Sequence, residues 1–126
     1  MPAANLPSDV LHFLQERIDT VPHLEALLII WQSKDAWTAR ELSSRIYVDE
    51  ASAQILLLSL QRAGLLGSED SLTFRFSAQD PGLEELMPRV SQTYYGNITR
   101  VASLIHGKAS SSILEFARAF DLKKAR

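Results

Sequence analysis

The spacing of apolar residues along the chain predicts a mostly helical fold. In residues 8–18 and 21–33, apolar side chains return every three or four positions, which is the period of one face of an α-helix. The second segment is apolar nearly all the way around, and such helices are usually buried on several sides. We therefore expect residues 21–33 to form a central helix, packed between the first helix and the elements that follow.

Two further helices joined by a tight turn are predicted next. Thr38 and Glu41 have the spacing of a capping box, which marks the start of a short helix that ends at Ile46. Asp49 can cap a second helix, and Gly64 suits the left-handed end of that helix. We expect the neighbouring segments to position this second helix or to cover it, so that the fold is organised around it.

A β-hairpin is predicted after Gly64. Residues 65–66 begin a strand, and residues 67–71 have the composition of a turn. Residues 72–76 then alternate between apolar and polar side chains, which is the period of a half-buried strand. Its apolar positions are Leu72, Phe74 and Phe76. Helix, helix, turn, helix and hairpin is the element order of a winged helix-turn-helix.

The segment ARELSSRIYVDEASAQILLLSLQRAGLL resembles winged-helix bacterial transcriptional regulators, such as the MarR-like group. Its end, LQRAGLL, is the part most typical of them, and the resemblance covers about residues 21–77. The resemblance implies a mostly α winged helix with a minor β component. It also implies double-stranded DNA as the partner, regulation of transcription as the function, and terminal helices that form a homodimer.

We expect a single domain over residues 1–126. Its winged-helix core covers residues 21–78. A helical extension covers residues 1–20 at the N-terminus, and a second one covers residues 80–126 at the C-terminus.

Two helices are predicted in the C-terminal extension. Apolar residues recur at helical spacing through residue 106, which predicts one long helix that Pro88 should kink and Gly96 should weaken. Gly107 should end it. The last helix carries an apolar stripe of Ile113, Phe116 and Phe120.

The long C-terminal helix has a spacing close to a heptad seam, with Asn97 as a polar interruption. The apolar positions of this seam are Leu83, Met87, Val90, Tyr94, Val101 and Leu104. Packing between two copies of the chain and packing against the chain's own core both fit this pattern. We favour a homodimer, because two long apolar helices on a small domain leave much surface to bury.

Composition and motifs argue against an enzyme. The chain has no cysteine, which excludes disulfides and thiol chemistry. Its histidines have no partner at metal-ligand spacing, and neither a phosphate-binding loop nor a nucleophile elbow is present. We expect no catalytic residue, metal or cofactor. No signal peptide or membrane span is expected either, so a cytoplasmic location is the default.

The residues that would contact DNA follow from the place of the helix after Asp49, which would enter the major groove. Ser52, Gln54 and Arg62 would face the groove. Arg40, Arg45 and Arg75 would bind phosphates, or would instead lie on a solvated surface and pair with nearby carboxylates. The net charge of -2 and the pI near 5.9 give no basic excess in favour of nucleic acid.

An alternative function follows from the outward face of the same helix. At 100° per residue, Ile55 and Leu58 point away from the core stripe, and Asp49 and Glu50 would repel phosphates. These two aliphatic side chains predict a protein-interaction adaptor that does not bind DNA. The last helix of the chain, a second copy or a different protein could cover them.

Overall fold

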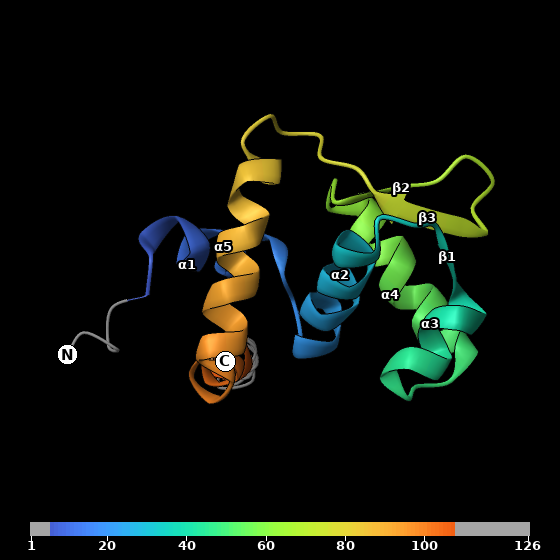
Figure 1. Cartoon of the computed structure of the whole chain (residues 1–126). Coiled ribbons are helices and arrows are strands. Elements are labelled where there is room, and N and C mark those ends of the chain that lie inside the picture. The colour runs from blue at the N-terminus through green and yellow to red at the C-terminus, as the bar shows by residue number, and fades with distance from the viewer. Residues whose placement is uncertain (1–5, 108–126) are drawn as a thin grey trace, which may run out of the picture.

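Helices make up most of residues 6–107, the part of the chain that the computed structural model describes (Figure 1). The elements are α1 (Ser8–Arg17), α2 (Val21–Ser33), β1 (Trp37–Thr38), α3 (Ala39–Ile46), α4 (Glu50–Arg62), β2 (Leu66–Gly67), β3 (Thr73–Phe76) and α5 (Leu83–Gly96). Residues 98–107 are also helical. The strands form an antiparallel sheet in the order β1-β3-β2, so the prediction of a mostly α chain with a minor β component is confirmed.

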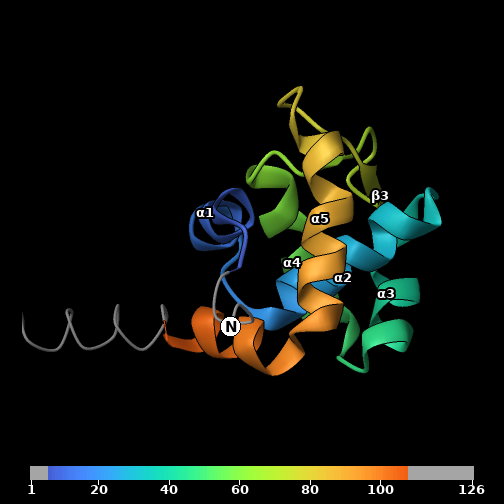
Figure 2. The same ribbon diagram turned by 60° about the vertical axis from the view of Figure 1, so that its left-hand side comes forward.

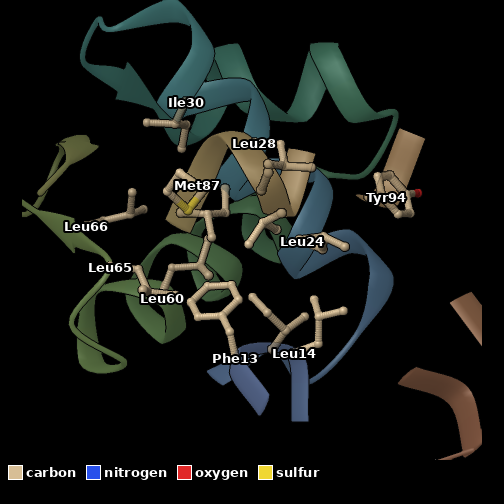
Figure 3. Close-up of a cluster of buried hydrophobic side chains, with 14 of the residues drawn as sticks. Phe13, Leu14, Leu24, Leu28, Ile30, Leu60, Leu65, Leu66, Met87 and Tyr94 are labelled. Carbon is tan, nitrogen blue, oxygen red and sulfur yellow. The ribbon is translucent and has the colours of Figure 1, made fainter. Parts of the chain in front are cut away.

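The helix α2 supplies the centre of the hydrophobic core, as its apolar pattern predicted. Its fully buried side chains are Leu24, Ala26, Leu27, Leu28 and Ile30. Phe13 from α1, Leu60 from α4 and Met87 from α5 join the same cluster (Figure 3). Because burying one leucine stabilises the fold by about 1.5–3 kcal/mol, this shared cluster holds the helices around α2.

The ends of α3 and α4 lie where the local sequence predicted them. Thr38 Oγ1 accepts the backbone N–H of Glu41 at 3.1 Å, and Glu41 Oε1 accepts the N–H of Thr38 at 2.9 Å. The carboxylate of Asp49 accepts the N–H of Ser52 at 2.6 Å, which caps α4. After α4, Gly64 has a φ of 81°, a left-handed conformation that favours glycine. These caps fix the start and the end of α4 within the fold.

The hairpin differs from the prediction at Leu72. Strand β3 begins only at Thr73, and Phe74 on this strand is fully buried opposite Trp37. Leu72 is 67% exposed, so its predicted place on the apolar side of the strand is wrong. The carboxylate of Asp70 accepts the N–H groups of Leu72 and Thr73, both at 2.9 Å, and so keeps Leu72 in the turn.

The prediction of one long C-terminal helix is also wrong. Helix α5 ends at Gly96, and Asn97 leaves the helical conformation with φ -146° and ψ 48°. The side-chain amide of Asn97 donates from Nδ2 to the backbone carbonyl of Thr93 at 3.0 Å, which satisfies an acceptor at the end of α5. Residues 98–107 therefore run across the end of α5 (Figure 2). Pro88 lies inside α5, which continues past it.

Most of the proposed dimer seam lies inside the chain. The buried members are Leu83, Met87, Val90, Tyr94 and Val101. Helix α5 packs beside α1 (Figure 2), and only Leu104 of the six side chains is exposed, at 41%. The five buried residues thus pack intramolecularly and are not free for a second copy. The homodimer stays a prediction, and the stripe of Ile113, Phe116 and Phe120 lies outside the described residues.

Two polar contacts tie the outer helices to the core. The hydroxyl of Tyr94 on α5 donates to Glu25 Oε2 on α2 at 2.8 Å, and burial raises the pKa of Tyr94 above its ordinary value. The guanidinium of Arg17 at the end of α1 donates to the carbonyl of Ala63 from Nε at 3.1 Å and from Nη2 at 2.8 Å. Its Nη1 donates to the carboxylate of Asp80 at 3.0 Å. Arg17 therefore joins α1 to the end of α4 and to the segment before α5.

Candidate interaction surface on α4 and the hairpin

Helix α4 has one buried side and one exposed side. Its buried residues are Ala53, Leu56, Leu57 and Leu60, which match the predicted core stripe. On the opposite side Ile55 is 64% exposed, whereas Leu58 is half-buried and packs against the core. Of the two aliphatic residues expected on the outward side, Ile55 is therefore the accessible one, and Leu58 lies at the border between the two sides.

The tip of the hairpin lies beside α4. The side-chain amide of Gln54 donates to the backbone carbonyl of Ser71 at 3.4 Å. Leu72 follows Ser71 directly and is as exposed as Ile55. This arrangement adds a second exposed aliphatic side chain to the region of α4. The sequence signal that could have revealed it is Asp70, because an aspartate often accepts backbone N–H groups two or three residues further on.

The conformation of the hairpin tip depends on an ionised carboxylate. Hydrogen bonds from the N–H groups of Thr73 and Leu72 lower the pKa of Asp70 to about 2. This pKa is below the ordinary value, so the bonds favour the folded tip above about pH 4 and are lost as the pH falls through about 2. The negative charge at the tip is thus a permanent feature at neutral pH.

Tyr47 is a further exposed apolar side chain next to α4. It lies in the turn between α3 and α4, is 92% exposed and has a left-handed φ of 60°. A left-handed conformation is uncommon for a bulky residue such as tyrosine. The turn therefore holds a large aromatic ring out in solvent just before the start of α4, a feature that the sequence did not predict.

The two uncharged candidates for DNA contacts make hydrogen bonds within the chain. Side-chain and backbone hydrogen bonds from Ser52 lower the pKa of Asp49, the capping residue of α4. Gln54 donates to Ser71 in the hairpin. Each of these side chains would have to give up an internal partner, at least in part, before it could contact a base.

The four arginine candidates are exposed, and none forms an ion pair with another residue between positions 6 and 107. Within residues 6–107, the side chains of Arg40, Arg45, Arg62 and Arg75 make no salt bridge or hydrogen bond, although the backbone carbonyl of Arg40 accepts the hydroxyl of Ser43 at 2.7 Å. Arg17 and Arg89, by contrast, pair with Asp80 and Asp9. The predicted alternative for Arg40, Arg45 and Arg75 was a solvated surface paired with nearby carboxylates. These residues are exposed, but the pairing is not found among residues 6–107.

The structure places these arginines on different elements. Arg62 lies seven residues after Ile55 on α4, which puts it on the same side of the helix about 10.5 Å further along. Arg40 and Arg45 lie on α3, the helix that packs on α4. Arg75 lies on β3, where it lines one hollow with Trp31 and Lys34 and another with Glu69 and Asp70 of the hairpin tip.

The described residues were also compared with the patterns of a metal site and of a membrane-spanning helix. Between residues 6 and 107, no group of three or more histidine, aspartate or glutamate residues is placed to hold a metal ion. No helix in this range is long and apolar enough to cross a membrane. Comparison of the sequence with protein-family models and with curated proteins found no match.

Proposed function

We propose that this chain is a small winged helix-turn-helix protein that acts by binding and not by catalysis. The order of α2, α3, α4 and the β2–β3 hairpin supports this interpretation, as does the pairing of β1 with the hairpin. In such a fold α4 and the hairpin tip are the parts that approach a partner. The nature of their exposed side chains therefore decides the class of that partner.

A protein is the partner that these side chains fit best. The observation that carries this proposal is the exposure of Ile55 on α4 and of Leu72 at the hairpin tip, at 64% and 67%. Burying each of them would gain about 1.5–3 kcal/mol, and the exposed ring of Tyr47 is typical of protein interfaces. Base edges in the major groove instead require hydrogen-bond donors and acceptors.

The charges near the hairpin tip also favour a protein. A wing that contacts DNA backbones needs lysine or arginine near its tip, whereas this tip carries Glu69 and Asp70. Arg62 lies at the far end of the exposed side of α4. An apolar centre with charged residues around it is the usual arrangement of a protein–protein interface.

Site-specific crosslinking tests the proposal. A photo-crosslinking residue at position 55 or 72, introduced in cells that produce the protein, should yield a discrete adduct with a second protein. The same residue at the exposed Gln92 on α5 should not yield it. In the variant with the crosslinker at position 72, Ile55→Asp should lower the yield at least about ten-fold, because it places a charge at the apolar centre.

The control for this experiment is stability. Ile55 is exposed, so Ile55→Asp should change the free energy of unfolding by no more than about 0.5 kcal/mol. Equal crosslinking from positions 55 and 92, or full crosslinking in the Ile55→Asp variant, would show that this surface does not dock a protein.

DNA binding by a transcriptional regulator is the second candidate. It is favoured by the four candidate arginines, whose side chains have no ion-pair partner within residues 6–107. Gel mobility shift with random duplex DNA tests it, because each phosphate contact contributes about 0.9 to the slope of log K against log salt. If DNA is bound, the triple variant Arg40→Gln, Arg45→Gln, Arg62→Gln should reduce this slope by about 2–3. Arg89→Gln is the control, since Arg89 already pairs with Asp9. Absence of a shift even at low salt excludes this candidate.

A further inference from the structure

A hollow lies between the end of α2, β3 and the first turn of α5, and no residue of α4 lines it. Five residues line this hollow of about 500 Å³: Trp31, Lys34, Arg75, Phe76 and Glu84. They come from the end of α2, from β3 and from the first turn of α5, elements that are distant in sequence (Figure 1). Arg75 is exposed, and its neighbour Phe76 at the end of β3 is half-buried; both residues line the hollow.

The two aromatic rings of the hollow are held in place by the core. Trp31 and Phe76 are half-buried and pack against the central hydrophobic cluster. Both residues also line the hollow. Rings that are fixed on one side and accessible on the other provide a surface on which a planar ligand can stack at little cost in side-chain entropy.

The two cations at the hollow have no anionic partner among residues 6–107. Lys34 and Arg75 are exposed, and neither takes part in a salt bridge or a side-chain hydrogen bond within this range. Lys34 follows α2 in a left-handed conformation, and its N–H bonds to the carbonyl of Ile30. The backbone therefore fixes the point from which the Lys34 side chain starts, and Lys34 lines the hollow.

We propose that this hollow binds a mononucleotide. The base would stack on Trp31 and Phe76, and the phosphate would accept hydrogen bonds from Arg75 and Lys34. The carboxylate of Glu84 would accept a hydrogen bond from a sugar hydroxyl or from an amino group of the base. A nucleoside alone would not contact the two cations, and a sugar phosphate alone would not stack on the two aromatic residues. The volume of the hollow accommodates a nucleoside and its phosphate together.

Titrations followed by NMR test this site, with adenosine 5′-monophosphate, adenosine and ribose 5-phosphate as the probes. The nucleotide should produce saturable shifts of the Trp31 indole N–H and the Arg75 side chain. Its apparent Kd should be at least about ten-fold lower than that of either fragment, which corresponds to about 1.4 kcal/mol. Arg75→Gln and Lys34→Gln should each raise the Kd for the nucleotide about ten-fold while leaving adenosine unaffected.

Two control variants separate this site from the surface on α4. Arg40→Gln removes an exposed arginine that lies outside the hollow, and Ile55→Asp alters the proposed docking surface. Both should bind the nucleotide as the unchanged chain does. Equal affinity for the nucleotide and for ribose 5-phosphate would indicate a phosphate contact without stacking and would overturn the proposal. Shifts that do not saturate at millimolar nucleotide would overturn it as well.

Discussion

Leu57→Ala should lower the free energy of unfolding by about 2–5 kcal/mol. Leu57 is fully buried on the core side of α4, so the substitution removes apolar contacts and leaves a cavity. Urea unfolding followed by circular dichroism would measure the loss as a lower midpoint with an unchanged slope. A loss of this size would be a large share of the stability of a domain of this length.

Ile55→Ala provides the matched control on the same helix. Ile55 is two residues away and largely exposed, and alanine is a better helix former than isoleucine. The free energy of unfolding should therefore stay within about 0.5 kcal/mol of the original value. Equal losses at positions 55 and 57 would contradict the assignment of the two sides of α4, and with it the proposed docking surface.

Arg17→Met should lower the free energy of unfolding by about 1.5–3 kcal/mol. Methionine keeps much of the apolar stem of Arg17 but removes the donors that bond to Ala63 and Asp80. The carbonyl of Ala63 would lose two charged hydrogen bonds in a partly buried place. The same urea unfolding measurement detects this change.

Arg89→Met is the comparison for Arg17→Met. Arg89 pairs with Asp9 across α1 and α5, and about half of each side chain is exposed. Exposed ion pairs contribute at most about 1 kcal/mol, and salt weakens them. We expect a smaller loss for Arg89→Met, and one that shrinks further in high salt. A loss at position 17 no greater than the loss at position 89 would show that Arg17 does not anchor the end of α4.

The local sequence was enough to predict the elements whose ends depend on neighbouring residues. Thr38 with Glu41 marks the start of α3, and Asp49 marks the start of α4, because these caps act over three residues. The apolar period of α2 likewise predicted its central place, since a helix that is apolar on all sides must be buried. These features need no knowledge of distant segments.

Other features could not be predicted because they depend on contacts between distant segments. The apolar period continues across Asn97, so it does not reveal that the chain turns there. Assigning the residues of α4 to helix faces at 100° per residue treats the helix as isolated. This assignment could not show that Leu58 packs against the core. The same limitation hid the five buried members of the supposed dimer seam, whose partners come from other helices.

The candidate site was predicted in part. Ile55 was expected on the outward side and is exposed there. The exposure of Leu72 was not predicted, because its spacing from Phe74 is that of a strand. Asp70 instead keeps Leu72 in the turn. Within residues 6–107 the candidate arginines have no ion pair, which the sequence did not reveal, because Glu41 and Asp49 lie close in sequence but serve as helix caps. The role of a carboxylate in a cap competes with its role in an ion pair.

The contacts of Arg17 also bear on the order in which the chain folds. They join positions that are 46 and 63 residues apart in the sequence. Closing loops of this length costs more entropy than forming the local contacts between α3 and α4. We therefore expect the helical pair to form early and α1 to dock late. Helix α1 would then stabilise the end of α4 only in the last step of folding, after the rest of the core has assembled.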